Sequence, residues 1–242
     1  MLSLPFVIGH RGAALVAPEN TLASFRAAAE AGARMVEFDV RLSRDGRPVV
    51  FHDGRLERTT SGRGRVRDHD LAALQELDAG SWFAPGFAGQ AIPTLAQTLA
   101  LCLELGLAVN IEIKPDRGRE AETARAALAE AAALWPHDRP PPLVSSFAAA
   151  CLDVAGAVAP HWPRGLLVGR VPRDWRARTA RLGCVALHAD QRYLDAATVG
   201  RVAAAGLLVL AYTVNERTRA DQLRRAGVAA VFSDIPATFM ES

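Results

Sequence analysis

The side chains best suited to chemistry are carboxylates, histidines and cations that stand at or just beyond the ends of short apolar runs. They occur at four places in the sequence: His10-Arg11, Glu37 with Asp39, His52, and Glu112 with Lys114. Carboxylates bind cations, imidazoles transfer protons near neutral pH, and basic side chains bind anions. Such a set is typical of metal-assisted chemistry on a phosphate group.

Lys114 is the only lysine in the chain, so the other 27 of its 28 basic residues are arginines. Lysine presents a compact point charge, whereas the arginine guanidinium is a rigid planar fork. A tight site that holds one anionic oxygen beside a metal ion suits the first shape better than the second. Glu112 lies two residues before Lys114, so in a strand both side chains point to the same face. We therefore interpret Lys114 as part of the candidate site.

These side chains need a scaffold, and the sequence predicts one of the α/β class. Short apolar runs alternate with amphipathic stretches rich in Ala, Arg and Leu, which is the pattern of repeated βα units. Strands are expected at residues 6–9, 35–42, 107–113, 143–147, 165–168, 185–188, 207–214 and 229–232. Helices are expected between them, for example at residues 20–31, 120–135, 175–182, 196–205 and 217–226. Eight such strands predict a (β/α)8 TIM barrel, whose active site lies at the carboxyl ends of the strands.

A ninth apparent strand, residues 48–52, follows the turn signal Asp45-Gly46. We interpret this dipeptide as a two-residue hairpin turn, so residues 48–52 should run antiparallel to the second strand instead of joining the barrel. That register makes Asp39 and His52 direct cross-strand partners, and Glu37 shares their face. The hairpin therefore predicts that two carboxylates and one histidine converge.

The size and composition of the chain fit one domain over residues 1–242. The chain has 242 residues, is 50% hydrophobic and carries a formal net charge of +2. Residues 54–91 lack the βα rhythm, and we expect them to form a small, partly helical insertion after the second strand. Basic residues are scattered among acidic ones and aromatic residues are few, which argues against a nucleic-acid partner.

No stable membrane insertion is expected, and the chain fits a reducing compartment. Its most apolar helical stretch, residues 95–109, is interrupted by Gln97 and Glu104 and is too short to span a bilayer. The N-terminus shows neither a charged region nor a cleavage site, so no signal peptide is predicted. The three cysteines lie far apart without metal-ligand spacing. We expect them to be reduced, buried and structural, as in a cytoplasmic protein.

Eight short motifs follow one another along the chain. They are Gly9-His10-Arg11-Gly12, Ala17-Pro18-Glu19-Asn20-Thr21, Glu37-Phe38-Asp39-Val40, His52-Asp53, Ile111-Glu112-Ile113-Lys114, Ser145-Ser146-Phe147, Thr213-Val214-Asn215 and Ser233-Asp234-Ile235-Pro236. The ordered set resembles the glycerophosphodiester phosphodiesterase family, of the bacterial cytoplasmic type. The resemblance implies a barrel enzyme that hydrolyses glycerophosphodiesters, such as glycerophosphocholine or glycerophosphoethanolamine. The implied products are sn-glycerol 3-phosphate and an alcohol.

The resemblance also implies a metal site. Glu37, Asp39 and Glu112 match the positions that hold a divalent cation in the family. An all-oxygen ligand set favours Mg²⁺ or Ca²⁺ over zinc. The expected cofactor is therefore one of these two ions.

By the same resemblance, His10 and His52 match the general acid and base, and Arg11 and Lys114 match the residues that bind the phosphate. Each such proton transfer typically contributes about 10²- to 10⁴-fold to the rate. The sequence leaves open which histidine is the acid. It also leaves open whether water attacks the phosphorus directly or a cyclic phosphate forms first.

One residue departs from the family pattern, and a few others have open roles. The family usually has tryptophan where this chain has Tyr212, which we interpret as a substrate-binding aromatic beside the glycerol moiety. Asn20 is expected to cap the helix that follows it. Glu19 fits structural and functional roles equally well, and for His188 a structural role is favoured at least as much as substrate contact. Asp234 either supports the site or belongs only to a turn.

Three alternatives are compatible with the sequence. The buried carboxylates of the candidate site would also fit a structural salt-bridge network with arginines. A related barrel enzyme of the phospholipase D type would act on lysophospholipids or sphingomyelin. A barrel that binds phosphodiesters without cleaving them is the third, although the acid, base and ligand positions are all intact. In each case the partner is a small molecule, and the oligomeric state is left open.

Overall fold

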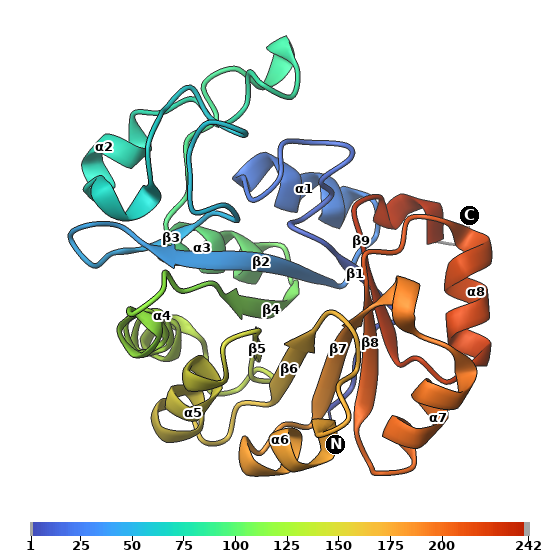
Figure 1. Cartoon of the computed structure of the whole chain (residues 1–242). Helices are drawn as coiled ribbons and strands as arrows, with labels where there is room; N and C mark the ends of the chain where they lie inside the picture. Colours follow the sequence, from blue (N-terminus) through green and yellow to red (C-terminus); the bar gives the residue numbers. More distant parts are fainter. Residues whose placement is uncertain (1, 240–242) are drawn as a thin grey trace.

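The computed structural model describes residues 2–239, and its strands confirm the predicted TIM barrel. Within these residues nine strands form one sheet, and eight of them are parallel and close on each other in the order β1-β9-β8-β7-β6-β5-β4-β2, with β1 also paired to β2 (Figure 1). The parallel strands are β1 (Val7–Gly9), β2 (Met35–Leu42), β4 (Ala108–Ile113), β5 (Leu143–Ser146), β6 (Arg164–Val168), β7 (Ala186–Asp190), β8 (Leu208–Tyr212) and β9 (Ala230–Ser233).

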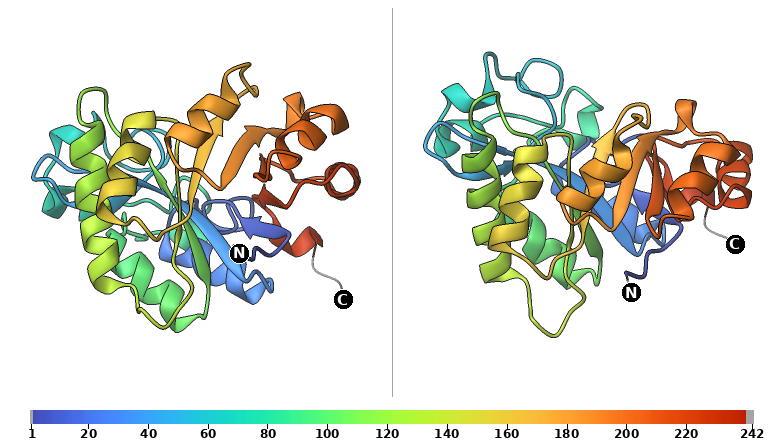
Figure 2. Two further views of the ribbon diagram at one scale, coloured as in Figure 1. Left: turned by 90° about the horizontal axis from the view of Figure 1, so that it is seen from below. Right: turned by 60° about the horizontal axis from the view of Figure 1, so that its bottom comes forward.

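Helices cover the outside of this barrel, as right-handed βα crossovers require. They are α1 (Leu22–Glu30), α3 (Leu95–Glu104), α4 (Glu120–Leu134), α5 (Ala149–Val158), α6 (Trp175–Arg181), α7 (Ala196–Ala203) and α8 (Arg217–Arg225). In both views of Figure 2 the green and yellow helices flank one side of the barrel, and the orange and red helices flank the other. No helix within residues 2–239 is both long enough and apolar enough to cross a bilayer.

Alternate side chains of each strand point into the barrel, and toward the amino ends of the strands this interior is apolar. The buried apolar cluster of this interior consists of Ile8, Met35, Leu143, Ala186, Leu210, Ala230 and Phe232, and Phe232 extends to the cavity at the carboxyl ends of the strands. Farther along the strands the inward side chains become polar, as at Glu37, Asn110 and His188. The barrel interior is therefore mainly apolar toward the amino ends of the strands and polar toward their carboxyl ends.

A glycine makes room for one of the polar side chains. A Cβ atom at Gly165 of β6 would lie 2.3 Å from Nε2 of His188, whose side chain fills that space from the neighbouring strand β7. His188 is fully buried. Its ring therefore cannot withdraw from a larger neighbour without disturbing the barrel interior.

We predict that Gly165→Ala destabilises the protein. Overpacking of this kind typically costs about 1–3 kcal/mol, and in a chain of this size each kcal/mol lowers the Tm by roughly 2–4 °C. Thermal unfolding measures the effect. Gly169→Ala is the matched control, because a Cβ there meets nothing within 4 Å. Equal Tm values for the two variants would contradict the steric argument.

The ninth strand, β3 (Pro48–Val50), pairs antiparallel with β2 outside the barrel, as predicted. The predicted register is wrong by one residue, because Val40 pairs with Val50 and the amide of Phe51 donates to the carbonyl of Asp39. The loop has three residues, 44–46, closed by the bond from the Ser43 amide to the Arg47 carbonyl. Gly46 takes the left-handed conformation, with φ of 75°, that such a loop needs at its last position.

Residues between β3 and α3 do not join the barrel. They contain the short helices η1 (Val66–Asp68), α2 (Leu71–Gln75) and η2 (Pro85–Phe87). With β3 they bury a small apolar cluster of their own: Val49, Phe51, Leu56, Val66, Leu74, Ala79 and Ile92. In Figure 1 the teal part of the chain that carries α2 lies outside the ring of strands. This segment forms part of the wall beside the carboxyl ends of β1 and β2.

Candidate active site

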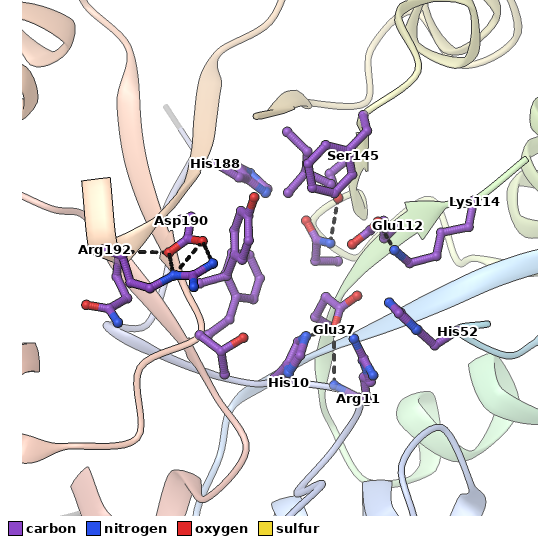
Figure 3. A pocket seen from close by; sticks show the side chains of 17 residues that line it. His10, Arg11, Glu37, His52, Glu112, Lys114, Ser145, His188, Asp190 and Arg192 are labelled. Atoms are coloured by element: carbon purple, nitrogen blue, oxygen red, sulfur yellow. Dashed lines mark hydrogen bonds and ion pairs between the residues drawn. The ribbon is translucent and has the colours of Figure 1, made fainter. Parts of the chain in front are cut away.

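A cavity of about 460 Å³ opens at the carboxyl ends of the strands (Figure 3). It brings together candidate residues from β1, β2 and β4 with the segment after β3. Those in its lining are His10, Arg11, Glu37, His52, Glu112, Lys114 and Tyr212. Asp39 is not in the lining, but one of its carboxylate oxygens lies within 4.8 Å of oxygens of Glu37 and Glu112. The structure thus places all the sequence-predicted site residues at one mouth.

Three carboxylates form the centre of the site. Glu37, Asp39 and Glu112 each place an oxygen within 4.8 Å of the others. The period of two along β2 puts Glu37 and Asp39 on the same inward face, and the parallel register pairs Asp39 with Glu112. All three side chains are buried, and Oε1 of Glu37 has no hydrogen-bond partner among the described residues. Buried carboxylate oxygens of this kind are hard ligands, so the group fits Mg²⁺ or Ca²⁺.

The charges of this cluster are not fully compensated by the protein. Burial, with the nearby Asp39 and Glu112 charges, raises the pKa of Glu37 well above its usual range. Burial and the Asp39 charge also raise the pKa of Glu112. Asp39 behaves in the opposite way: burial opposes its ionisation, but Arg11 and Lys114 outweigh it and lower its pKa. A further positive charge would therefore stabilise the group.

Two cations flank the carboxylates. Nζ of Lys114 lies 2.7 Å from Oε1 of Glu112 and 3.5 Å from Oδ1 of Asp39. Nε of Arg11 lies 3.3 Å from Oδ2 of Asp39, and the Arg11 amide donates to Oε2 of Glu37 at 3.0 Å. The salt-bridge alternative is thus present in part. It gives Asp39 and Glu112 cationic neighbours, but within residues 2–239 Oε1 of Glu37 has neither a cation nor a hydrogen-bond donor as partner.

Each candidate histidine is held by an aspartate. Nδ1 of His10 lies 2.6 Å from Oδ1 of Asp234, and Asn215 donates from Nδ2 to the other oxygen of Asp234 at 2.8 Å. Nδ1 of His52 lies 2.5 Å from Oδ1 of Asp53. In both pairs the aspartate engages Nδ1, so Nε2 is the nitrogen left for a substrate. Burial lowers the pKa of His52 despite the nearby Asp39 charge.

The family model of the glycerophosphoryl diester phosphodiesterases matches residues 10–238. The chain belongs to this family. A glycerophosphodiester phosphodiesterase of Caldanaerobacter subterraneus is 34% identical, over 97% of this chain and 96% of that protein. One from Bacillus subtilis is 32% identical, over 96% of this chain and 84% of that protein. The family and the enzyme class predicted from the sequence are therefore confirmed.

Solved structures of similar proteins also support membership of this family. A phosphodiesterase of Oleispira antarctica, solved in complex with the product sn-glycerol-3-phosphate, has a TM-score of 0.95 and 43% sequence identity. The match covers 97% of this chain and 95% of that one. A glycerophosphodiester phosphodiesterase of Thermotoga maritima has a TM-score of 0.76 and 28% identity, with 99% and 98% coverage. These likenesses extend over the barrel and the segment between β3 and α3.

Within this family member the side of the pocket opposite the carboxylates is formed by β7 and β8 (Figure 3). The Tyr212 hydroxyl donates to the Val168 carbonyl at 2.8 Å, and its ring meets Phe147 edge-on at 6.1 Å. Asp190 and Arg192 form an ion pair on the same side. His188 lies at the floor, and burial lowers its pKa to about 3, so its ring is neutral.

The role expected for Asn20 is wrong. Thr21 caps α1 instead, because its side chain accepts from the Ser24 amide. Asn20 takes φ of 57°, a conformation that asparagine tolerates better than most residues, and turns its side chain toward β2. There its Nδ2 donates to Oδ2 of Asp39 at 2.8 Å, and its Oδ1 accepts from the Asp39 amide at 3.2 Å. Asn20 therefore orients one of the three carboxylates.

The remaining open positions also prove to contact site residues. Glu19 accepts from Nη1 of Arg11 at 2.7 Å, and Asp234 contacts His10 as described above. Asp53 was recognised only as part of the His52-Asp53 motif, without a role, and Arg58 was not singled out from the sequence. Arg58 binds both Glu19 and Asp53. Acidic and basic residues alternate after the His52-Asp53 motif, and this was the available signal in the sequence. It does not show that Arg58 contacts Glu19, because the two residues lie in different loops.

Proposed function

We propose that this enzyme is a metal-dependent hydrolase of glycerophosphodiesters such as glycerophosphocholine, and that it releases sn-glycerol 3-phosphate and an alcohol. The observation that carries the proposal is the meeting of a buried three-carboxylate cluster with two aspartate-held histidines in one cavity. The product bound in the Oleispira antarctica relative supports the substrate class. We assign the activity to one barrel domain over residues 1–242, with residues 54–91 as its insertion.

We assign the divalent cation to Glu37, Asp39 and Glu112. An ion held by these residues would supply Lewis acidity that stabilises negative charge on a phosphate oxygen. The amide of Arg11 and the side chain of Asn20 fix the orientation of two of these carboxylates. The side chains of Arg11 and Lys114 add positive charge beside the same position, which suits a phosphodiester anion.

The two histidines divide the proton transfers. His52 has a lowered pKa and is neutral at pH 7, so we assign it as the base that takes a proton from the attacking hydroxyl. His10, held by Asp234, then donates a proton to the leaving oxygen. One P–O bond forms and one breaks, and the proton lost by the nucleophile is matched by the one that the alcohol gains. An attacking water gives both products in this one exchange. An attacking glycerol hydroxyl gives the alcohol and a cyclic phosphate, and a second exchange, in which water attacks and the ring P–O bond breaks, then yields sn-glycerol 3-phosphate with the two histidines in reversed roles.

Metal removal tests the proposal. Protein treated with EDTA should lose hydrolysis of glycerophosphocholine, and Mg²⁺ or Ca²⁺ should restore it. The readout is sn-glycerol 3-phosphate formed per minute, with choline measured in parallel to show that the ester bond on the expected side is cleaved. Full activity in EDTA would contradict metal dependence. Activity on a lysophospholipid but not on glycerophosphocholine would replace the substrate assignment with the phospholipase D alternative.

A further inference from the structure

Arg58 binds two carboxylates from different loops at once. Its Nε and Nη2 lie 2.6 and 3.1 Å from the two oxygens of Asp53. Its Nη1 and Nη2 lie 2.7 Å and 2.7 Å from the two oxygens of Glu19. Both edges of the guanidinium fork are therefore used in paired hydrogen bonds. The segment between β3 and α3 supplies this arginine, and the loop after β1 supplies Glu19.

Each of these carboxylates also contacts a residue that lines the cavity. Asp53 lies 2.5 Å from Nδ1 of His52, and Glu19 accepts from Nη1 of Arg11 at 2.7 Å. The contacts form one continuous chain: His52, Asp53, Arg58, Glu19, Arg11. Figure 3 shows its two ends, His52 and Arg11, on the carboxylate side of the cavity. The three middle residues of this series of contacts, Asp53, Arg58 and Glu19, are not part of the cavity lining.

We propose that Arg58 is a positioning residue for the phosphodiesterase reaction, which holds His52 and Arg11 in a fixed relative placement through Asp53 and Glu19. This inference rests on the proposed roles of His52 as base and Arg11 as a phosphate ligand. A base and an anion-binding group must keep their separation while the nucleophile attacks, because small misplacements of reacting groups are costly. Arg58 supplies that constraint from a segment that is not part of the barrel.

The charges explain why a cation is needed at this point. Asp53 and Glu19 would repel each other without a positive group between them. Burial opposes the ionisation of Asp53, but the hydrogen bonds from Arg58 and His52 lower its pKa to about 2. Ionised Asp53 keeps a proton on Nδ1 of His52, which leaves Nε2 as the acceptor.

The shape of the group explains why it is arginine. A planar fork binds two carboxylates through paired hydrogen bonds, whereas lysine offers one point charge without a fixed plane. The Arg58 side chain is 45% exposed. Its replacement therefore leaves the apolar interior intact, and the effect on catalysis should exceed the effect on stability.

The test compares Arg58→Ala and Arg58→Lys with wild type in the metal-loaded enzyme, using glycerophosphocholine. We expect both variants to lower kcat by about 10- to 100-fold, while Tm changes by only a few degrees. Added guanidinium ion, well below denaturing concentrations, should restore part of the kcat of Arg58→Ala. Arg55→Ala is the matched control, because Arg55 is an exposed neighbour whose side chain pairs with Glu57 at 2.6 Å.

Double variants separate positioning from a general structural effect. If Arg58 acts through Asp53, then Arg58→Ala should cost little further activity in an Asp53→Asn background. Additive losses would overturn the inference, and so would an Arg58→Ala kcat within about twofold of wild type, or equal losses in Arg55→Ala. The proposed function is judged separately: wild-type inactivity with every ion would reject that function. Full activity in His52→Ala would instead reject the role of His52 as base, on which this inference rests.

Discussion

Replacing either candidate histidine with alanine should lower kcat by about 10²- to 10⁴-fold, the usual contribution of one positioned proton-transfer group. His52 and His10 both line the cavity, each with Nδ1 engaged by an aspartate and Nε2 left for the substrate. Neither ring belongs to the apolar interior, since His52 is 28% exposed and His10 is 15% exposed. The Tm of each alanine variant should therefore change little, although its kcat falls steeply.

The leaving group distinguishes the two roles. p-Nitrophenolate departs without a proton, so loss of the general acid matters less for a p-nitrophenyl ester of glycerol phosphate than for glycerophosphocholine. His10→Ala should therefore recover much of its activity on the p-nitrophenyl ester. His52→Ala should not, because the attacking hydroxyl still needs a base. Rates on both substrates, compared as ratios to wild type, measure the difference.

His69→Ala provides the control for these variants. His69 lies in the segment between β3 and α3, contacts the Arg65 carbonyl at 2.9 Å and is absent from the cavity lining. Its replacement should leave both rates unchanged. The reverse pattern, with His52→Ala rescued by the p-nitrophenyl ester, would exchange the acid and base assignments. Equal hydrolysis by wild type and both histidine variants would remove these residues from the mechanism.

Much of the site could be predicted because strand periodicity is local. Glu37 and Asp39 lie two apart on one strand, so they share a face wherever the strand is placed. Glu112 and Lys114 are also two apart, and although β4 ends at Ile113, the Lys114 amide still donates to the Val40 carbonyl and continues the ladder. Barrel closure then brings the carboxyl ends of all strands to one mouth. These two rules place the carboxylates and Lys114 together without any long-range information.

The hairpin register depended on finer detail. A turn containing Asp45-Gly46 closes a loop of two or three residues, and the sequence does not distinguish them when Arg44 also fits the loop. The observed three-residue loop shifts the pairing by one, so Phe51 and not His52 pairs with Asp39. His52 still reaches the cavity because it lies beyond the end of β3, where the backbone no longer follows the strand pattern.

The supporting residues could not be predicted because their partners are distant in sequence. Arg58 and Glu19 are 39 residues apart, and His10 and Asp234 are 224 apart. Asn20 occupies a sequence position typical of a helix cap, and only the left-handed backbone turn directs its side chain to Asp39. Residues that touch the reaction are recognisable by type. Residues that orient them are polar side chains like many others, and only the fold shows what they contact.

Replacing Glu37 with glutamine should abolish the metal response of the protein and yet stabilise its metal-free form. Glu37 is buried, its Oε1 has no partner among residues 2–239, and Asp39 and Glu112 lie close by. In the absence of a cation, ionised Glu37 opposes folding. Glutamine removes the charge and keeps an oxygen that can accept from the Arg11 amide, which now bonds Glu37 at 3.0 Å. Each kcal/mol of repulsion removed should raise the Tm by about 2–4 °C.

The pH dependence of this gain has a definite sign. The folded-state pKa of Glu37 is raised, so its charge destabilises the protein at high pH and the penalty disappears as pH falls below the unfolded-state value. Glu37→Gln should therefore exceed wild type in Tm most clearly above the raised pKa, in EDTA. The difference should vanish in acid, where Glu37 is protonated in both the folded and the unfolded chain.

Thermal unfolding with added Mg²⁺ or Ca²⁺ completes the test. A ligand that binds only the folded state raises its stability with concentration, so wild type should show a rising Tm and Glu37→Gln should not. Activity should fall by more than the roughly 10- to 100-fold typical of residues that only orient a metal ligand. Glu104→Gln is the control, because Glu104 is 65% exposed on α3 and pairs loosely with Arg26. A metal-dependent Tm rise of wild-type size in Glu37→Gln would show that the ion binds elsewhere than at this cluster.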